Sequence, residues 1–277
     1  MTQLADYGSN RYSQSGEDGV LTEIWRRLGM GGKVCVEFGA GDGVSCSNTA
    51  SLRLEQGWKA VLIEADPIKA KRCAEQVALP SVAIERAVTT SGPDSIDALL
   101  AEHGVTSVDF MSVDVAGMDI WIVTEMASRP RVLCVEFNKT IPAHIEIRPN
   151  RMDNRFGVSA ATLRRALEQR GYTLIGITDT NCWFVQTADT HHFEDLDTDL
   201  AHLLPPEQFM YLATDYLGHA VPLGPTPPWG LRWPPSNTEF VANQSGLLNV
   251  DIADSMERWM QWILEQLVDL RRAIAEK

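Results

Sequence analysis

The chain has 277 residues, of which 44% are hydrophobic, and its 24 basic and 37 acidic side chains give a net charge of −13. This length suits one large α/β domain, or one domain with a substantial appendage. The negative charge opposes nucleic-acid phosphates and anionic lipid surfaces, so we expect neither as a partner. No apolar run has membrane-spanning length and residues 1–16 do not resemble a signal peptide, which predicts a cytoplasmic protein.

Apolar strand-like runs alternate with segments of helical period from residue 17 to about residue 187. Seven strands are expected, at Val34–Phe38, Ala60–Glu64, Val82–Ala87, Val108–Asp114, Val132–Phe137, Tyr172–Ile177 and Cys182–Gln186. Six helices are expected around them, at Glu17–Leu28, Ser47–Gln56, Ile68–Val77, Ser95–His103, Met118–Ala127 and Ala160–Arg170.

The order of these elements predicts the fold class. The first five strands are apolar throughout, which is typical of a parallel sheet covered by helices on both faces. The last two flank a turn at residues 178–181 and predict an antiparallel terminal hairpin. A dinucleotide dehydrogenase normally continues with another crossover helix instead. We therefore expect residues 1–187 to form a Rossmann-like seven-stranded methyltransferase sheet.

The character of the chain changes after residue 187. Eight of the 14 prolines fall between Pro205 and Pro235, and Trp229 and Trp233 lie among them. Residues 188–250 are too apolar for a disordered linker and predict a loop-rich lid or substrate-binding appendage. Residues 251–277 predict an amphipathic helix, which either docks on its own domain or forms the seam of a homodimer.

A glycine-rich turn, EFGAGDG from Glu37 to Gly43, follows the first predicted strand. Its three glycines, Gly39, Gly41 and Gly43, let a ligand approach the backbone and by themselves indicate only a nucleotide-like ligand. Glu37 narrows the choice, because a carboxylate before the turn suits a cation. S-adenosylmethionine (SAM) carries a sulfonium and an ammonium where NAD carries a pyrophosphate. The turn therefore favours SAM, with a tight turn that binds no ligand as the alternative.

Four further residues complete the expected cofactor site. Glu64 ends the second strand, where a carboxylate can bridge the two ribose hydroxyls, although a solvated strand end would also carry one. Ala87 ends the third strand and would border the adenine. Gln14 and Ser15 precede the first helix and would bond to the amino-acid end of SAM, although helix capping explains that segment too.

Side chains with oxygen atoms follow the fourth and fifth predicted strands. Strand alternation puts Glu136 and Asn138 on one side, so with Asp114 they could present three oxygen ligands to Mg²⁺. This arrangement is similar to the metal site of catechol-type and macrolide-sugar O-methyltransferases, where the second pair is adjacent. A metal-free crevice whose carboxylates bind the cofactor and substrate hydroxyls is the alternative.

Methylation of a hydroxyl needs a base or a metal, because the oxygen is a poor nucleophile until its proton is removed or polarised. The candidate catalytic residues are Asp114, Asp119 at the start of the next helix, and His144 in the loop after the fifth strand. An ordinary loop histidine is the alternative for His144.

Several of these motifs together resemble the FkbM-type SAM-dependent methyltransferases. They are Ser13–Gly19, Val36–Thr49, Gly57–Lys59, Asp114–Asp119, Glu136–Asn138 and Asn181–Val185. The resemblance covers about residues 10–187. It implies a class I SAM fold and methylation of a hydroxyl, often on a sugar or a secondary metabolite. The usual relatives read Asp-Gly-Asn-Asp in the fourth-strand turn, whereas this chain reads Ala-Gly-Met-Asp at residues 116–119.

The sequence therefore predicts a SAM-dependent O-methyltransferase that acts on a sugar, an oligosaccharide or another polyhydroxylated small molecule. Trp229 and Trp233 motivate the sugar, because flat rings can stack on pyranose faces. Two alternatives stay open: an NAD-dependent sugar oxidoreductase, and a SAM-binding dimerisation module that has lost catalysis. The altered turn at residues 116–119 motivates the second alternative.

Overall fold

The computed structural model of the chain describes residues 1–115, 117–151, 157–214, 216, 220–223 and 225. The chain divides into two units, Met1–Gly224 and Pro225–Lys277. Of the second unit, the structure describes Pro225. Trp229, Trp233 and the helix expected in residues 251–277 lie outside the described residues.

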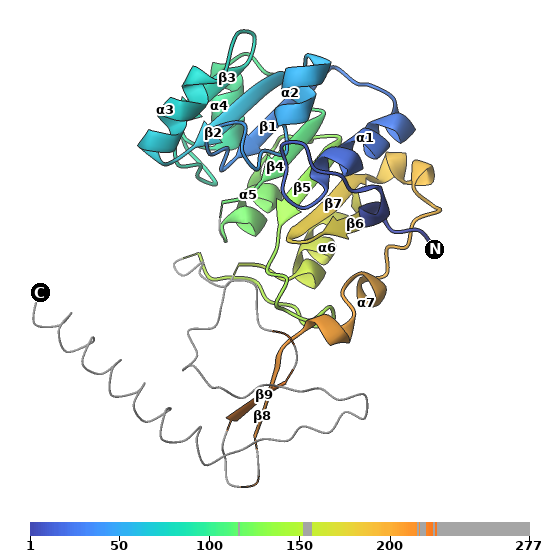
Figure 1. The fold of residues 1–277 in the computed structure, drawn as a ribbon. Helices are drawn as coiled ribbons and strands as arrows, with labels where there is room; N and C mark the ends of the chain where they lie inside the picture. Colours follow the sequence, from blue (N-terminus) through green and yellow to red (C-terminus); the bar gives the residue numbers. More distant parts are fainter. Residues whose placement is uncertain (116, 152–156, 215, 217–219, 224, 226–277) are drawn as a thin grey trace, which may run out of the picture. The chain divides into compact units, whose positions relative to one another are not determined.

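A seven-stranded sheet is the centre of the first unit (Figure 1). Its strands are β1 (Val34–Phe38), β2 (Lys59–Glu64), β3 (Val82–Glu85), β4 (Phe110–Val113), β5 (Val132–Glu136), β6 (Tyr172–Thr178) and β7 (Asn181–Gln186). The order is β3-β2-β1-β4-β5-β7-β6, with β7 antiparallel to both neighbours and the other six strands parallel to one another. The expected Rossmann-like methyltransferase sheet is confirmed.

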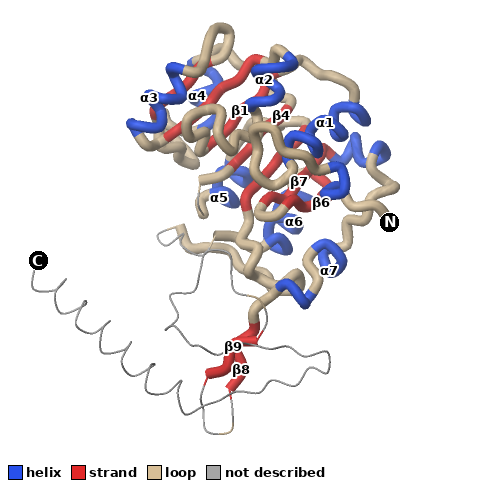
Figure 2. The backbone as a smooth tube through the Cα atoms, viewed as in Figure 1, coloured by secondary structure: helices blue, strands red, loops and turns tan. Residues whose placement is uncertain are grey.

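Helices cover both faces of this sheet, as a mostly parallel sheet requires. They are α1 (Glu17–Leu28), α2 (Ala50–Gln56), α3 (Pro67–Glu75), α4 (Ile96–Glu102), α5 (Asp119–Glu125) and α6 (Ala160–Glu168). Side chains of α4, α5 and α6 share one hydrophobic core with the sheet, and those of α1, α2 and α3 share the other. Figure 2 shows these helices in blue around the red strands.

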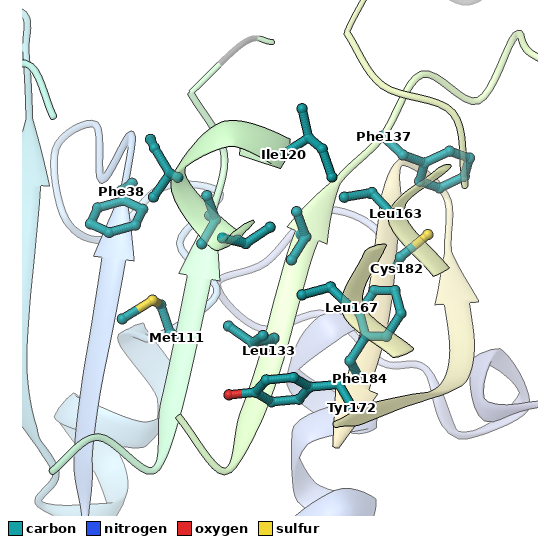
Figure 3. Close-up of a cluster of buried hydrophobic side chains, with 14 of the residues drawn as sticks. Phe38, Met111, Ile120, Leu133, Phe137, Leu163, Leu167, Tyr172, Cys182 and Phe184 are labelled. Carbon is teal, nitrogen blue, oxygen red and sulfur yellow. The ribbon is translucent and has the colours of Figure 1, made fainter. Parts of the chain in front are cut away.

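The alternation of side chains along each strand feeds the two cores separately. Phe38, Met111 and Leu133 enter the core below α4, α5 and α6, where Phe184 of the terminal hairpin joins them (Figure 3). On the other face the ring of Phe110 stacks on that of Trp183, with 5.8 Å between centroids. Burial of one such side chain contributes roughly 1.5–3 kcal/mol.

Most predicted boundaries agree with the structure or shift slightly, and α2 shows the clearest correction. This helix begins at Ala50 and not at Ser47 as predicted. Residues 47–49 precede the helix, and all three bond to the Glu37 carboxylate. The third strand ends at Glu85, two residues before the predicted Ala87.

The first unit continues beyond residue 187, where we expected the catalytic domain to end. Its later elements are η2 (Thr187–His192), α7 (Leu200–Leu203), η3 (Pro206–Gln208), β8 (Tyr211–Thr214) and β9 (Ala220–Leu223). Leu196, Leu204 and Phe209 are buried in the two cores of the sheet. The first part of the expected appendage therefore packs on the same body as the sheet.

The start of the chain packs against its later segments. Leu4, in the short helix η1 (Leu4–Tyr7), is fully buried against β6, so that a side chain at Gly176 would collide with Leu4. Thr2 forms an isolated parallel bridge with Leu196. Among the described residues, no helix is both long and apolar enough to cross a membrane.

Candidate functional site

The glycine turn follows β1, and all three of its glycines have left-handed backbone angles. The φ angles are 65° at Gly39, 58° at Gly41 and 78° at Gly43. A side chain at Gly39 would collide with the carbonyl oxygen of Asp114, and a Cβ at Gly43 would lie 2.9 Å from Cys73 Sγ. A Cβ at Gly41 would meet no atom within 4 Å. Two glycines are thus required by packing, while Gly41 borders open space.

Glu37 lies beneath this turn and holds the segment that enters α2. Its side chain is 4% exposed and accepts hydrogen bonds from Ser47 Oγ and Thr49 Oγ1, each at 2.6 Å. The backbone N–H of Asn48 donates to its other oxygen at 2.7 Å. Burial raises the pKa of Glu37, although these hydrogen bonds oppose the rise. The predicted cation-facing carboxylate is therefore also a structural anchor.

Glu64 ties the end of β2 to the glycine turn. Its Oε2 accepts the backbone N–H of Gly41 at 2.8 Å, and its Oε1 accepts that of Asp66 at 2.9 Å. Each oxygen keeps a second lone pair, so the carboxylate could still accept the two ribose hydroxyls expected there. Ala87, the residue expected at the adenine, is exposed two positions beyond the end of β3.

Asp114 and Glu136 form a carboxyl pair at the ends of β4 and β5. The parallel register matches Val113 with Val135, so the next residues on each strand are neighbours, and their side chains are hydrogen-bonded. Two carboxyl groups can bond in this way only when one of them holds a proton. Desolvation raises the pKa of Asp114, and its bond to Glu136 works in the opposite direction.

Asn138, the third expected metal ligand, turns its amide oxygen toward its own loop. Asn138 Oδ1 accepts the Thr140 backbone N–H at 2.9 Å and the Thr140 hydroxyl at 2.6 Å. Both lone pairs of the amide oxygen are therefore occupied. Within the described part of the chain no group of three His, Cys, Asp or Glu side chains could hold a metal ion. The residues present do not form a fitted metal site in this conformation.

Asp119 clamps the turn between β4 and α5. Its side chain is 1% exposed, with Oδ1 accepting Val115 N–H at 2.9 Å and Oδ2 accepting Gly117 N–H at 2.7 Å. Desolvation raises the pKa of Asp119 to about 6. Both oxygens thus fix the backbone after Asp114, so the geometry favours a positioning role for this candidate base.

The segment before α1 is held by the acidic residues that begin the helix. Asp18 Oδ2 accepts hydrogen bonds from three consecutive backbone N–H groups, Arg11 to Ser13, at 2.8 to 2.9 Å. Arg11 pairs with Glu55 of α2 at 2.7 Å. This segment therefore packs beside the helix that follows the glycine turn.

Glu17 extends the same segment to the carboxyl pair. It is fully buried, accepts the Ser15 N–H at 2.7 Å and accepts the Asn181 side-chain amide at 3.1 Å. Asn181 is the register partner of Glu136 across β5 and β7. Ser15 therefore lies near the ends of β5 and β7, and the neighbouring Gln14 has an exposed side chain.

Sequence reasoning missed the links that Glu17 and residues 47–49 make. Asn48 also donates from its side chain to Ser112 Oγ at 3.0 Å, which joins the α2 segment to β4. The signal for these links was a run of polar residues after an acidic strand end, since a buried carboxylate requires hydrogen-bond donors.

His144 lies elsewhere along the β5–α6 loop and is exposed. It lines a pocket of about 250 Å³ together with Pro142, Ala143, Asp199, Leu200, Ala201, Leu204, Pro206, Phe209 and Tyr211. The lining contains none of the strand-end carboxylates, so the structure brings His144 together with α7 rather than with Asp114.

Three strand-end carboxyl groups are not neutralised by ion pairs with basic side chains of the described residues. Among the described residues, no ion pair includes Glu37, Glu64 or Asp114. Asp114 contributes to the raised pKa of Glu37, which follows from two like charges on one face of the sheet. Chemically, this edge of the sheet suits a cationic ligand or a neutral polyhydroxylated one, and it disfavours a pyrophosphate.

No protein-family model matches the chain, and no curated protein matches it either. Similar solved structures include the O-methyltransferase TomG of tomaymycin synthesis from Streptomyces achromogenes, at 21% identity and a TM-score of 0.39, over 63% of this chain and 82% of that one. Mitomycin 7-O-methyltransferase MmcR is 14% identical with a TM-score of 0.35, and the match spans 61% of this chain and 55% of the other.

The cyclase SpnF is 16% identical with a TM-score of 0.39, over 73% of this chain and 72% of that chain. These three structures are two O-methyltransferases and a cyclase. Such distant likenesses concern the fold alone. None of the three is named as an FkbM-type enzyme, so that resemblance stays a prediction.

Proposed function

We propose that this chain is a SAM-dependent methyltransferase that acts on a hydroxyl group. The observation that carries the proposal is the open space at Gly41, whose backbone N–H donates to Glu64, while Glu37 holds the segment that enters α2. The surrounding sheet has the strand order expected for such enzymes. The unpaired negative charge around the turn supports a cationic cofactor over NAD, whose pyrophosphate would meet repulsion.

The residues present fit SAM. The backbone of Gly39–Gly43 would border the methionine and ribose, Glu64 would accept the ribose hydroxyls, and Ala87 would border the adenine. Gln14 and Ser15 would bond to the amino-acid end. When bound, SAM supplies an electrophilic methyl group that an oxygen nucleophile attacks in line.

The carboxyl pair would take up the proton of the acceptor hydroxyl. A carboxylate with a raised pKa is a stronger base than a solvated one, and the desolvated Asp114 has this property. The pair would act as the base after it has lost the proton that its hydrogen bond requires; the proton taken from the acceptor hydroxyl would then lie on Asp114 and restore the hydrogen bond to Glu136. Asp119 would keep the backbone after Asp114 in position, whereas His144 lines the separate pocket beside α7 and has no part in this scheme.

We propose a sugar or another polyhydroxylated small molecule as the acceptor, because paired carboxyl groups can accept hydrogen bonds from neighbouring hydroxyls. Mg²⁺ at Asp114, Glu136 and Asn138 is not needed for this scheme. The homodimer expected from residues 251–277 remains a proposal, and size-exclusion chromatography with light scattering would test it.

A matched pair of glycine variants tests the cofactor site. Gly41→Val should weaken the binding of S-adenosylhomocysteine at least about tenfold in calorimetric titration, because the new side chain fills the open space. Gly57→Val is the control, since Gly57 has φ 70° and equally open surroundings at the end of α2. Equal affinity in both variants, or no binding by the wild type, would refute the site; preferential binding of NAD would favour the oxidoreductase.

The proposed base is tested by activity toward a panel of hydroxylated acceptors. Asp114→Asn should lower the methyl-transfer rate by about 10² to 10⁴-fold while S-adenosylhomocysteine still binds. The wild-type rate should rise with pH as the carboxyl pair loses its proton, and the rate of the variant should not show this rise. Turnover should be unchanged in excess EDTA. Persistent activity in the variant contradicts the assignment, and an inactive wild type favours the non-catalytic module.

A further inference from the structure

Two arginines and a tryptophan meet beside α5, apart from the acidic residues described above. Trp121 lies in the first turn of α5 and its side chain packs against the core of the sheet. The guanidinium carbon of Arg148 is 3.7 Å from the centroid of the Trp121 ring, and that of Arg151 is 4.3 Å from it. We call these three residues the arginine–tryptophan cluster.

The cluster joins three loops on the ligand-binding edge of the sheet. Arg151 donates to Thr90 Oγ1 at 3.4 Å and forms an ion pair with Glu125. Thr90 follows β3, Trp121 follows β4 and Arg148 follows β5. In open α/β sheets, ligands bind outside the carboxyl ends of the strands. The cluster therefore lies at the same edge as the carboxyl pair.

The cluster carries a surplus positive charge in a strongly acidic protein. Glu125 neutralises Arg151, whereas the exposed Arg148 contacts the Trp121 ring and, among the described residues, no carboxylate. The whole chain has a net charge of −13. Two guanidinium groups against one ring repel each other, and the cation–π contacts offset only part of that repulsion.

The contact with the Trp121 ring also prepares Arg148 to donate hydrogen bonds. When the face of a guanidinium group lies over an aromatic ring, its N–H groups point outward in the guanidinium plane, where a ligand can reach them. Because the ring already orders the Arg148 side chain, less conformational entropy is lost when a ligand binds. An oxyanion is the ligand that matches such a planar set of donors.

We propose that the arginine–tryptophan cluster binds an oxyanion, a phosphate or a carboxylate, that the methyl acceptor carries. The inference rests on the proposed methyl transfer and narrows its substrate class to hydroxylated acceptors with an anionic group. The carboxyl pair would bind the reacting hydroxyl group of the acceptor. The cluster would bind the anionic group of the same acceptor molecule at a separate point.

Calorimetric titrations of the full-length protein at low ionic strength test the site, with inorganic phosphate in one arm and acetate in the other. The wild type should bind at least one of them with millimolar affinity. The anion that binds more tightly shows whether the site prefers a phosphate or a carboxylate. Arg148→Gln should weaken binding about tenfold, as expected for loss of a charge-assisted donor. The affinity of Arg148→Lys should lie between those of the wild type and Arg148→Gln, because lysine keeps the charge and loses the planar set of donors.

The control is Arg26→Gln, an exposed arginine on α1 that pairs with Glu23, and it should bind as the wild type does. No binding of either anion by the wild type, unchanged affinity in Arg148→Gln, or an equal loss in Arg26→Gln would overturn the proposal. Circular dichroism checks that each variant is folded; if Arg148→Gln is not, Arg148→Lys decides alone.

A third titration separates the anion site from the cofactor site. Phosphate or acetate should bind equally well with saturating S-adenosylhomocysteine, whereas competition would assign the cluster to the cofactor and overturn the proposal. S-adenosylhomocysteine titrated alone tests the proposed function. Failure of that titration with intact anion binding would refute the methyltransferase and leave the anion site standing.

Discussion

Four carboxylates at the carboxyl end of the sheet differ in what their oxygen atoms contact. Glu37 and Asp119 bond to backbone or hydroxyl donors on both oxygens, and Glu64 accepts two backbone N–H groups. Asp114 instead is hydrogen-bonded to the carboxyl group of Glu136, and desolvation raises its pKa. Three of these carboxylates therefore hold the surrounding backbone in place, and the fourth, Asp114, is the candidate base.

The clamp formed by Asp119 predicts a particular pH dependence of stability. Its folded-state pKa is raised from 3.8 to about 6, so the folded state holds a proton that the unfolded state releases. This contribution to stability is fully present below pH 3.8 and is lost as the pH rises through about 6.

Urea denaturation of the wild type and of Asp119→Asn at stepped pH isolates this effect, since the amide does not titrate. The free energy of unfolding of the wild type, minus that of the variant, should fall on the order of 1 kcal/mol per pH unit between about pH 4 and 6. A difference that stays constant over this range contradicts the prediction.

At the scale of the elements, the start of α2 depends on one serine. Ser47 Oγ donates to Glu37 and accepts the backbone N–H groups of Thr49 and Ala50, at 3.2 and 3.1 Å. Ser47→Ala should lower the free energy of unfolding by about 1–3 kcal/mol, because a buried carboxylate loses a donor and two N–H groups lose an acceptor.

Urea denaturation measures this loss, with Ser45→Ala as the matched control. Ser45 is exposed and its hydroxyl bonds to the accessible Asp42, so its removal should change stability by less than about 0.5 kcal/mol. Equal effects of the two substitutions would show that the buried network does not hold the helix start.

Hydrophobic periodicity predicted the elements because both cores of this sheet are made of regular strands and helices. The bounds of β1 and α1 follow from the apolar pattern alone. The start of α2 did not follow, because Glu37 lies ten residues before Ser47 and the bond between them depends on how the turn folds back. The hydrophobic periodicity of a short segment carries no information about such a contact between separate parts of the chain.

The candidate site was predictable to the extent that it follows from topology. Glu37, Glu64, Asp114 and Glu136 end neighbouring parallel strands, so their proximity follows once the strand order is known. The positions of His144 and Arg148 depend instead on the path of the β5–α6 loop. Loop paths are set by individual tertiary contacts, which no periodic pattern encodes.

At the scale of the whole molecule, the described cofactor candidates all lie in the first unit, Met1–Gly224. A chain ending at Gly224 should therefore bind S-adenosylhomocysteine with an affinity within about twofold of the full-length protein, a difference below 0.5 kcal/mol. Calorimetric titration of both proteins measures the ratio. A loss of about tenfold or more would show that residues 225–277 contribute to the cofactor site.

The packing of Leu4 and Thr2 against β6 and Leu196 sets an order of events during synthesis. Residues 1–28 leave the ribosome well before β6 and β7, yet Leu4 has its partner only when Gly176 has been made, and Glu17 has its own only after Asn181. Helix α1 can form early, but its buried acid waits for the last hairpin. Residues 1–28 are therefore among the last to be buried, and Leu4 stays accessible to chaperones until the terminal hairpin has been made.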